Sequence, residues 1–291
     1  MRESAFHRCH PAVNFLYFLI AAGTAMLFAH PVYLGIGAAV ALGWLGLLRG
    51  RRGLASALRL AIPLSLLVVV LSPLANARGR DILFRLFGRP ITLQAVQAAM
   101  LSAAMLFLVI LWFSLYAAVM TSDRFLTLFG RVAPSASLLV SMTLRLIPAM
   151  QERLTMIRQA RRGLLGEPEP GRALRDRIRE GLHAMTTLMT WSMEGSIATA
   201  DAMKARGYGA GRRTTFSLSR FGRIDARVLT VLIVLFAVVT VAHFAGGTGF
   251  PLYPKAAPIR VDLPALAAYV SYAALLSVPL WMEIEEKVLW R

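Results

Sequence analysis

The sequence predicts an all-α, polytopic membrane protein with about six transmembrane helices and long cytoplasmic coupling helices. Of its 291 residues, 57% are apolar and only 16% are charged, whereas roughly 25% of the residues in a soluble domain are charged. The apolar residues form uninterrupted stretches separated by arginine-rich segments, and a bilayer crossing needs about 20 such residues. This composition excludes a soluble globular enzyme.

Residues 1–120 are expected to hold four of the spans. Only His30 and Pro31 separate the apolar runs 13–29 and 32–48, so we expect a tight helical hairpin there. Arg49, Arg51 and Arg52 form a basic loop after the second run. The four predicted spans are residues 13–29, 32–48, 58–75 and 94–120.

A small β-hairpin is predicted between the third and fourth spans. The apolar segments 82–84 and 90–92 flank Gly88, and short apolar runs on either side of a glycine are typical of a hairpin.

Residues 228–291 are expected to hold the last two spans, 228–246 and 265–282. Six spans place both termini on one face, and that face also carries the basic loop and the arginine-rich segment 121–227. The positive-inside rule makes this face cytoplasmic. The loop between the third and fourth spans argues against this orientation. The orientation would place the loop outside, where only Asp81 balances four arginines: Arg78, Arg80, Arg85 and Arg89.

Residues 121–227 are predicted to form a cytoplasmic coupling-helix segment. They carry 18 Lys or Arg and 9 Asp or Glu residues but keep the apolar spacing of amphipathic helices. The first helix follows Leu139 and should kink near Pro148, which lacks a backbone donor. It is expected to run into Gly163, ahead of a helix-breaking segment at residues 166–171, and the second helix, from about Arg172, is expected to end at Gly207.

Both helices thus end with an arginine followed by a glycine that is able to adopt the left-handed conformation. Arg-Gly is also an ordinary helix stop signal, in which the arginine interacts favourably with the helix dipole. A guanidinium presents five donors in a rigid fork and keeps its charge, which suits docking into a groove lined by carboxylates or carbonyls.

Methionines recur along the second helix at Met185, Met189 and Met193. Methionines at this spacing are ordinary packing residues, but they form an adaptable surface where they meet a partner.

Several other functions find no support in the residues. No Gly-x-x-x-x-Gly-Lys-Ser/Thr loop occurs, so the chain is not expected to bind ATP itself. Neither a catalytic triad nor a carboxylate pair stands out, and the basic residues are not interleaved with aromatic residues as single-strand nucleic-acid binders require. His7, Cys9 and His10 are a possible metal-ligand set near the N-terminus, but they lack second-shell support. We therefore expect no enzyme activity, no nucleic-acid partner, no cofactor and no bound metal.

The segment Ala-Met-Lys-Ala-Arg-Gly-Tyr at 202–208 resembles the second signature of the transmembrane T component of energy-coupling-factor (ECF) transporters, the EcfT/CbiQ family. Residues 144–148 resemble the Leu-Arg-Phe-Ile-Pro segment of that family, and residues 159–163 resemble its first signature. The resemblance extends over residues 58–246. The first signature usually reads Ala-Arg-Gly, whereas Arg161 occupies the alanine position here, so either Arg161 or Arg162 is the docking residue; alignment on Gly163 favours Arg162.

The resemblance implies the transmembrane coupling subunit of an ATP-driven importer of a micronutrient, a vitamin or a transition-metal ion, in a prokaryotic plasma (inner) membrane. Its partners would be two cytoplasmic ATP-binding-cassette ATPase subunits and a small substrate-binding membrane subunit, the S component. The residues expected to dock to the ATPase subunits are Arg161, Arg162, Gly163, Ala205, Arg206 and Gly207. Those expected on the coupling-helix interface with the S component are Arg145, Pro148, Met185, Met189 and Met193. The alternative is a permease of an ordinary ABC importer, which would itself line the translocation path.

Overall fold

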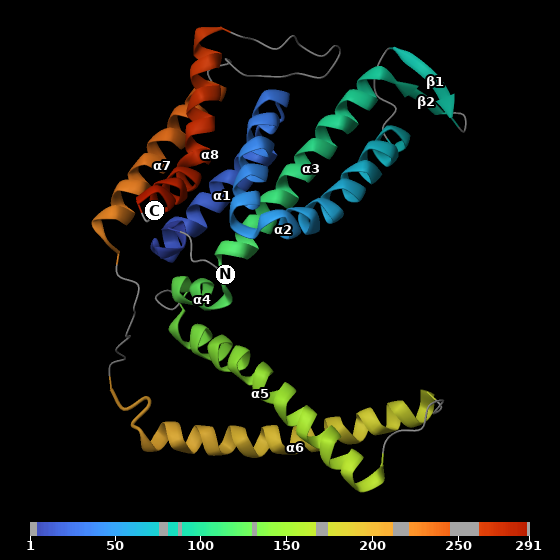
Figure 1. Ribbon diagram of the computed structural model, residues 1–291, viewed down its shortest axis with the longest axis vertical. Helices are drawn as coiled ribbons and strands as arrows, with labels where there is room; N and C mark the ends of the chain where they lie inside the picture. Colours follow the sequence, from blue (N-terminus) through green and yellow to red (C-terminus); the bar gives the residue numbers. More distant parts are fainter. Residues whose placement is uncertain are drawn as a thin grey trace. The chain divides into compact units, whose positions relative to one another are not determined.

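The computed structural model describes residues 5–75, 81–86, 89–129, 133–166, 174–211, 221–244 and 262–289. These residues form helices almost throughout, with one two-stranded sheet (Figure 1). The chain divides into two compact units, which we call the core unit, Met1–Phe125 with Ser219–Arg291, and the arm unit, Leu126–Leu218. The arm unit contains α5 (Pro134–Leu165) and α6 (Leu174–Ala205), and α4 (Ser122–Phe129) crosses the boundary between the units.

The core unit begins with a helical hairpin. A short 3-10 helix, η1 (Ala5–Arg8), precedes α1 (Pro11–Leu27), and α2 (Pro31–Ala75) follows after three residues. His30 caps α2, because its Nδ1 accepts a hydrogen bond from the Val32 N–H at 3.2 Å. The tight connection predicted at His30 and Pro31 is confirmed.

The basic segment around Arg51 is a bend within α2. Gly50 has φ 63° and ψ −167°, and helical residues continue on both sides of it (Figure 1). One left-handed residue changes the direction of the chain without needing a loop, and glycine adopts that conformation without steric cost. The predicted loop at Arg49–Arg52 is therefore wrong, and helix resumes directly at Arg51 instead of at residue 58.

The predicted hairpin is confirmed as β1 (Ile82–Leu86) and β2 (Arg89–Thr92), which pair in antiparallel register. Thr92 ends the hairpin and caps α3 (Leu93–Val119), since its Oγ1 accepts a hydrogen bond from the Ala95 N–H at 3.3 Å. Gln94 donates from Nε2 to Asp81 Oδ2 at 2.8 Å and ties the start of α3 to the start of the hairpin.

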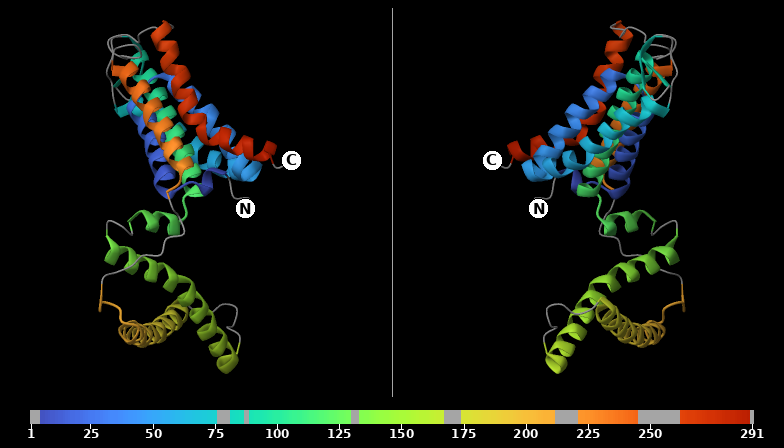
Figure 2. Two further views of the ribbon diagram at one scale, coloured as in Figure 1. Left: turned by 90° about the vertical axis from the view of Figure 1, so that its left-hand side faces the viewer. Right: turned by 90° about the vertical axis from the view of Figure 1, so that its right-hand side faces the viewer.

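Two further helices, α7 (Arg223–Ala242) and α8 (Leu263–Leu289), complete the core unit and lie side by side (Figure 2). Four described helices are long and apolar enough to cross a membrane: α2, α3, α7 and the part of α8 up to Glu285. The apolar α1 has 17 residues, the lower end of the range for a span. Four spans are counted where the sequence predicts about six, because α1 is short and the second and third predicted spans are two halves of α2.

The centre of the core unit is an aromatic cluster. Phe18 stacks on Trp44 with ring centroids 5.6 Å apart, and Tyr17 meets Trp112 edge to face at 6.0 Å. Phe6 of η1 is fully buried and meets the rings of both Tyr17 and Trp44. Aromatic pairs in such geometries contribute about 0.5–1.5 kcal/mol each beyond the area that they bury. The N-terminal segment is therefore part of the core.

The polar atoms of this cluster bond to α8. The Tyr17 hydroxyl donates to the Leu276 carbonyl oxygen at 2.7 Å, and Trp44 Nε1 donates to Glu283 Oε2 at 2.8 Å. Glu283 is buried, and an ionisable residue in such a place needs a partner.

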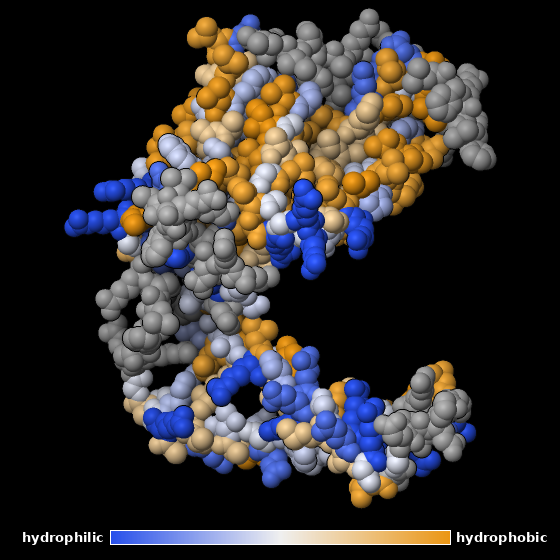
Figure 3. Space-filling model, viewed as in Figure 1, coloured by the Kyte–Doolittle hydropathy of each residue, from blue (hydrophilic) through white to orange (hydrophobic). Residues whose placement is uncertain are grey.

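On the face seen in Figure 3, hydrophobic side chains cover most of the described part of the core unit. Large apolar side chains that are more than half exposed occur on each of its long helices, for example Leu66, Met100, Phe113, Val241 and Val270. A soluble protein rarely exposes so much contiguous apolar surface, whereas a bilayer requires it. The fold is that of a helical membrane protein.

The Trp44–Glu283 bond predicts a specific stability loss. Trp44→Phe removes the buried donor and part of the ring, so we expect the free energy of unfolding in mixed micelles to fall by about 1–3 kcal/mol. Trp281→Phe is the matched control, because Trp281 is 69% exposed and should change stability little. Equal unfolding curves for the two variants would contradict the assignment.

Candidate functional site

The first arm helix, α5, has defined ends. It begins at Pro134, a residue suited to the first helical position. It ends at Gly166, which has φ 79° and donates its N–H to the Arg162 carbonyl oxygen at 2.9 Å. Pro148 lies inside the helix, where it removes one backbone donor.

Gly163 does not end this helix. It lies inside α5, and the helix continues through Leu165; Gly163 is not among the described glycines with positive φ. Gly163 does not stop the helix as predicted, because a single interior glycine weakens a helix by only about 1 kcal/mol relative to alanine. The helix ends at Gly166, where the predicted breaker begins. Arg162 still lies in the last turn of α5, as expected.

The end of α6 is a Schellman motif. Gly207 has φ 76° and donates its N–H to the Lys204 carbonyl oxygen at 2.9 Å, while the Tyr208 N–H donates to the Met203 carbonyl oxygen at 3.0 Å. These are the paired bonds that satisfy the last carbonyls of a helix when a left-handed glycine follows it. The motif confirms Gly207 as the end of the helix and places the exposed Arg206 at its cap position.

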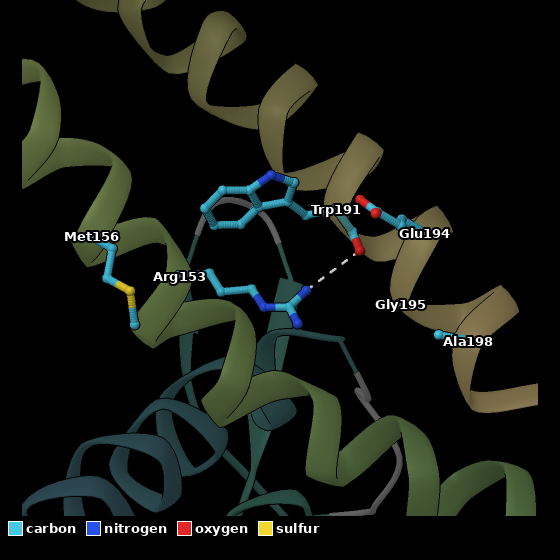
Figure 4. A pocket seen from close by; sticks show the side chains of 6 residues that line it. All are labelled: Arg153, Met156, Trp191, Glu194, Gly195 and Ala198. Carbon is cyan, nitrogen blue, oxygen red and sulfur yellow. Dashed lines mark hydrogen bonds between the residues drawn. The ribbon is translucent and has the colours of Figure 1, made fainter. Parts of the chain in front are cut away.

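α5 and α6 meet through few contacts. Arg153 of α5 reaches toward α6, where its Nη1 donates to the Trp191 carbonyl oxygen at 3.4 Å and its guanidinium carbon lies 6.0 Å from the centroid of the Trp191 ring (Figure 4). Gly195 is beside them, and a methyl group there would lie 3.8 Å from Arg153 Nη1. The open cleft between the helices is lined by Arg153, Met156, Trp191, Glu194, Gly195 and Ala198.

Sequence reasoning missed this contact. Arg153 and Trp191 lie 38 residues apart in two amphipathic helices, and helical periodicity does not indicate which residues of two helices meet. The sequence offered no signal that separates Gly195 from the other glycines of the two helices, Gly163 and Gly181, beside which a methyl group would meet nothing within 4 Å.

The two candidate docking residues at the end of α5 differ in their surroundings. Arg161 is half-buried and donates from Nη1 to the Glu180 carbonyl oxygen of α6 at 3.4 Å. Arg162, in contrast, is exposed, as is Gly163. Arg162 is therefore the residue of this pair whose guanidinium is available to another protein.

Most apolar side chains of the arm helices are exposed. Of the described α6 side chains, only Ala184 and Leu188 are buried. Met185, Met189 and Met193 are 57%, 68% and 72% exposed. A helix is normally stabilised by packing its apolar face, and within the arm unit this face of α6 is left largely uncovered.

The remaining predicted interface residues lie on α5. Arg145 and Pro148 are both exposed, as are Leu146 and Ile147 next to them. The other predicted docking residue of α6, Ala205, is exposed beside Arg206.

The two chain segments that lead from the core unit to the arm unit both contact α1 or its N-cap residue. At one, the rings of Phe15 and Phe125 meet edge to face at 6.3 Å. At the other, Asp225 in the first turn of α7 accepts hydrogen bonds from the N–H groups of His10 and Gly222, each at 2.8 Å. We call these contacts the α1 anchor. They place residues 121–125 and 221–227 in the core unit, although both ranges fall in the predicted cytoplasmic segment.

Cys9 is buried inside the α1 anchor. Burial raises the pKa of its thiol to about 11, the carboxylate of Asp225 contributes to the increase, and Arg124 opposes it. The thiol is therefore protonated at neutral pH and weakly reactive. Among the described side chains, no three metal-ligating groups lie together; the side chain of His7 lies outside that set.

Comparison with known proteins gives no assignment, because no family model matches the chain and no curated protein sequence is similar to it.

The glycines of the two arm helices should respond differently to alanine. Gly207→Ala forces an alanine into the left-handed region, which costs about 1–2 kcal/mol, so the Tyr208 amide should exchange with deuterium about 5- to 30-fold faster. Gly163→Ala is the matched control, since nothing lies within 4 Å of a methyl group there and alanine is the better helix former. Faster exchange near residue 163 in this control would show that Gly163 has a special conformation after all.

The raised pKa of Cys9 predicts slow alkylation. Iodoacetamide reacts with the thiolate, so at pH 8 Cys9 should react about 100-fold more slowly than a cysteine with an ordinary pKa, and the rate should rise tenfold per pH unit up to about pH 11. Cys9 is the only cysteine, so mass spectrometry of the labelled chain reports this rate directly. A Cys9→Ser, Ser196→Cys chain gives the exposed reference, and equal rates at the two positions would contradict the buried anchor.

Proposed function

We propose that this chain is the transmembrane coupling subunit of an ATP-driven ECF-type importer of a micronutrient, a vitamin or a transition-metal ion. It would link two cytoplasmic ABC ATPase subunits to a small substrate-binding membrane subunit. The observation that carries the proposal is the arm unit, in which two long helices each present an exposed arginine in their last turn or at their cap, together with largely uncovered apolar faces.

Arg162 and Arg206 are the proposed docking residues. Each is exposed, and each is held by backbone bonds at its helix end, so little side-chain and loop ordering is needed on binding. A guanidinium in such a place binds carboxylates or carbonyl oxygens of a groove in an ATPase subunit. Arg161 has a different role in this proposal, because its bond to Glu180 holds α5 against α6.

The methionine face of α6 is the proposed surface for the substrate-binding subunit. Met185, Met189 and Met193 occupy one side of the helix at intervals of four residues. Flexible, polarizable side chains adapt to partners of different shape, which suits a subunit that must bind another protein through a cycle of conformations.

Movement of the arm helices would reach the membrane through their two connections. Closure of the ATPase subunits would draw the ends of α5 and α6 together as rigid bodies, and the α1 anchor would hold residues 125 and 225 against the core unit. We further propose six crossings of a prokaryotic plasma (inner) membrane, by α1, the two halves of α2, α3, α7 and α8, with both termini cytoplasmic. The positive-inside rule favours this orientation, because it places both the bend of α2 with Arg49, Arg51 and Arg52 and the basic arm unit on the cytoplasmic side.

The alternative is a permease subunit of an ordinary ABC importer. Such a subunit would line the translocation path itself, whereas the α5–α6 pair presents paired arginine ends on two long helices. The composition of the complex separates the two proposals, because only the ECF-type importer contains a third, small membrane subunit that retains the substrate.

Charge reversal at the helix ends tests the proposal. Arg206→Glu or Arg162→Glu should weaken the association with the ATPase subunits by about 2–5 kcal/mol, at least 30-fold, because it places like charges in the groove, and transport should be lost. Membrane insertion should be unchanged. Co-purification of the ATPase subunits and uptake assays measure these effects.

Arg158→Glu is the matched control, since Arg158 is also exposed on α5 but lies one turn before the helix end; it should retain most of the association. Full uptake by Arg206→Glu would refute the docking role.

A further inference from the structure

The bend of α2 depends on two glycines, Gly50 and Gly53. Gly50 takes a left-handed conformation, and a Cβ atom at Gly53 would collide with the Cβ of Arg49. The colliding atom is attached directly to the backbone, so it cannot move aside. Both glycines are therefore needed for the bend, which brings the stem of Arg49 against the first turn of the second half of α2.

Three arginines surround this bend. Arg49, Arg51 and Arg52 are all exposed, and no Asp or Glu occurs between residues 5 and 75. Figure 3 shows hydrophilic side chains gathered near the bend, beside the apolar surface of the same helix. We call these three residues the basic bend.

Apolar surface continues on both sides of the basic bend. Leu47 precedes it and is 44% exposed. After it, large apolar side chains of the second half of α2 are more than half exposed: Leu60, Ile62, Leu66 and Leu67. A cationic group at the edge of an exposed apolar surface matches a molecule with an anionic head and apolar chains.

We propose that the basic bend binds the phosphate of an anionic phospholipid, whose acyl chains lie along the second half of α2. An arginine guanidinium matches phosphate oxygens in a bidentate geometry, and no Asp or Glu occurs within α2 itself to balance these positive charges. The exposed leucines favour a lipid over a free phosphate ion. This site is independent of the proposed importer function, because it needs only that the core unit lies in a membrane.

Native mass spectrometry of the full chain in neutral detergent tests the site, with phosphatidylglycerol and phosphatidylcholine as the added lipids. We expect the wild-type chain to retain phosphatidylglycerol in preference to phosphatidylcholine. The Arg49→Gln, Arg51→Gln, Arg52→Gln triple variant should bind phosphatidylglycerol on the order of 100-fold more weakly, at about 1 kcal/mol per arginine.

Two controls accompany this variant. Replacing the exposed arginines Arg158, Arg175 and Arg179 with glutamine removes the same charge from the arm unit and should leave phosphatidylglycerol binding within about twofold of wild type. Replacing the three arginines of the basic bend with lysine keeps the charge and should retain most of the binding, which separates loss of charge from damage to the bend.

The proposal is overturned if the glutamine variant of the basic bend binds phosphatidylglycerol as tightly as the wild type, or if the lysine variant loses binding as fully as the glutamine variant. It is also overturned if phosphatidylcholine binds equally well. Displacement of the lipid by millimolar inorganic phosphate would assign the site to a free anion instead; retention of the lipid supports the proposal.

Discussion

The uncovered apolar face of α6 is the constraint on which the account of this protein depends. α5 and α6 are 32 residues long, yet of the described α6 side chains only two are buried. Tertiary packing of an amphipathic face supplies most of the stability of a helix in a folded protein, and α5 provides little of it here. Under the proposed function, partner subunits would supply the missing contacts.

The two units differ in what could cover their exposed apolar side chains. The core unit exposes large apolar side chains all along α2, α3, α7 and α8, and lipid covers such a surface without further partners. The arm unit, residues 126–218, carries in contrast 21 charged side chains, 14 basic and 7 acidic, which is too many for a segment buried in hydrocarbon. The proposed ATPase and substrate-binding subunits would offer both anionic and apolar groups to the arm unit. The arginines at the helix ends and the methionines between them supply the matching chemistry.

Features that depend on local sequence were predictable. The apolar runs, the hairpin around Gly88 and the end of α6 at Gly207 follow from patterns within a few residues, since turn and capping preferences are local. Two local predictions failed for opposite reasons. Gly50 bends a helix where a loop was expected, and Gly163 remains helical where a stop was expected. A glycine permits a left-handed conformation, but the surrounding chain determines whether it adopts one.

The contacts between distant elements were not predictable from periodicity. Asp225 accepts a hydrogen bond from His10 across 215 residues, and Trp44 donates to Glu283 across 239; each depends on how whole helices pack. The same limit applied to the candidate site. The sequence left both Arg161 and Arg162 as candidates, with the alignment on Gly163 favouring Arg162, and it did not indicate that Arg161 donates to the Glu180 carbonyl oxygen.

The composition of the complex isolated from the native membrane tests the central claim most directly. The chain should be purified in mild detergent through a tag on this subunit, and its partners identified and counted by mass spectrometry. We expect two ATPase subunits and one small membrane subunit that holds a micronutrient, together with ATP hydrolysis that disappears when the ATPase subunits are removed. A chain that purifies alone, or that hydrolyses ATP without partners, would contradict this claim.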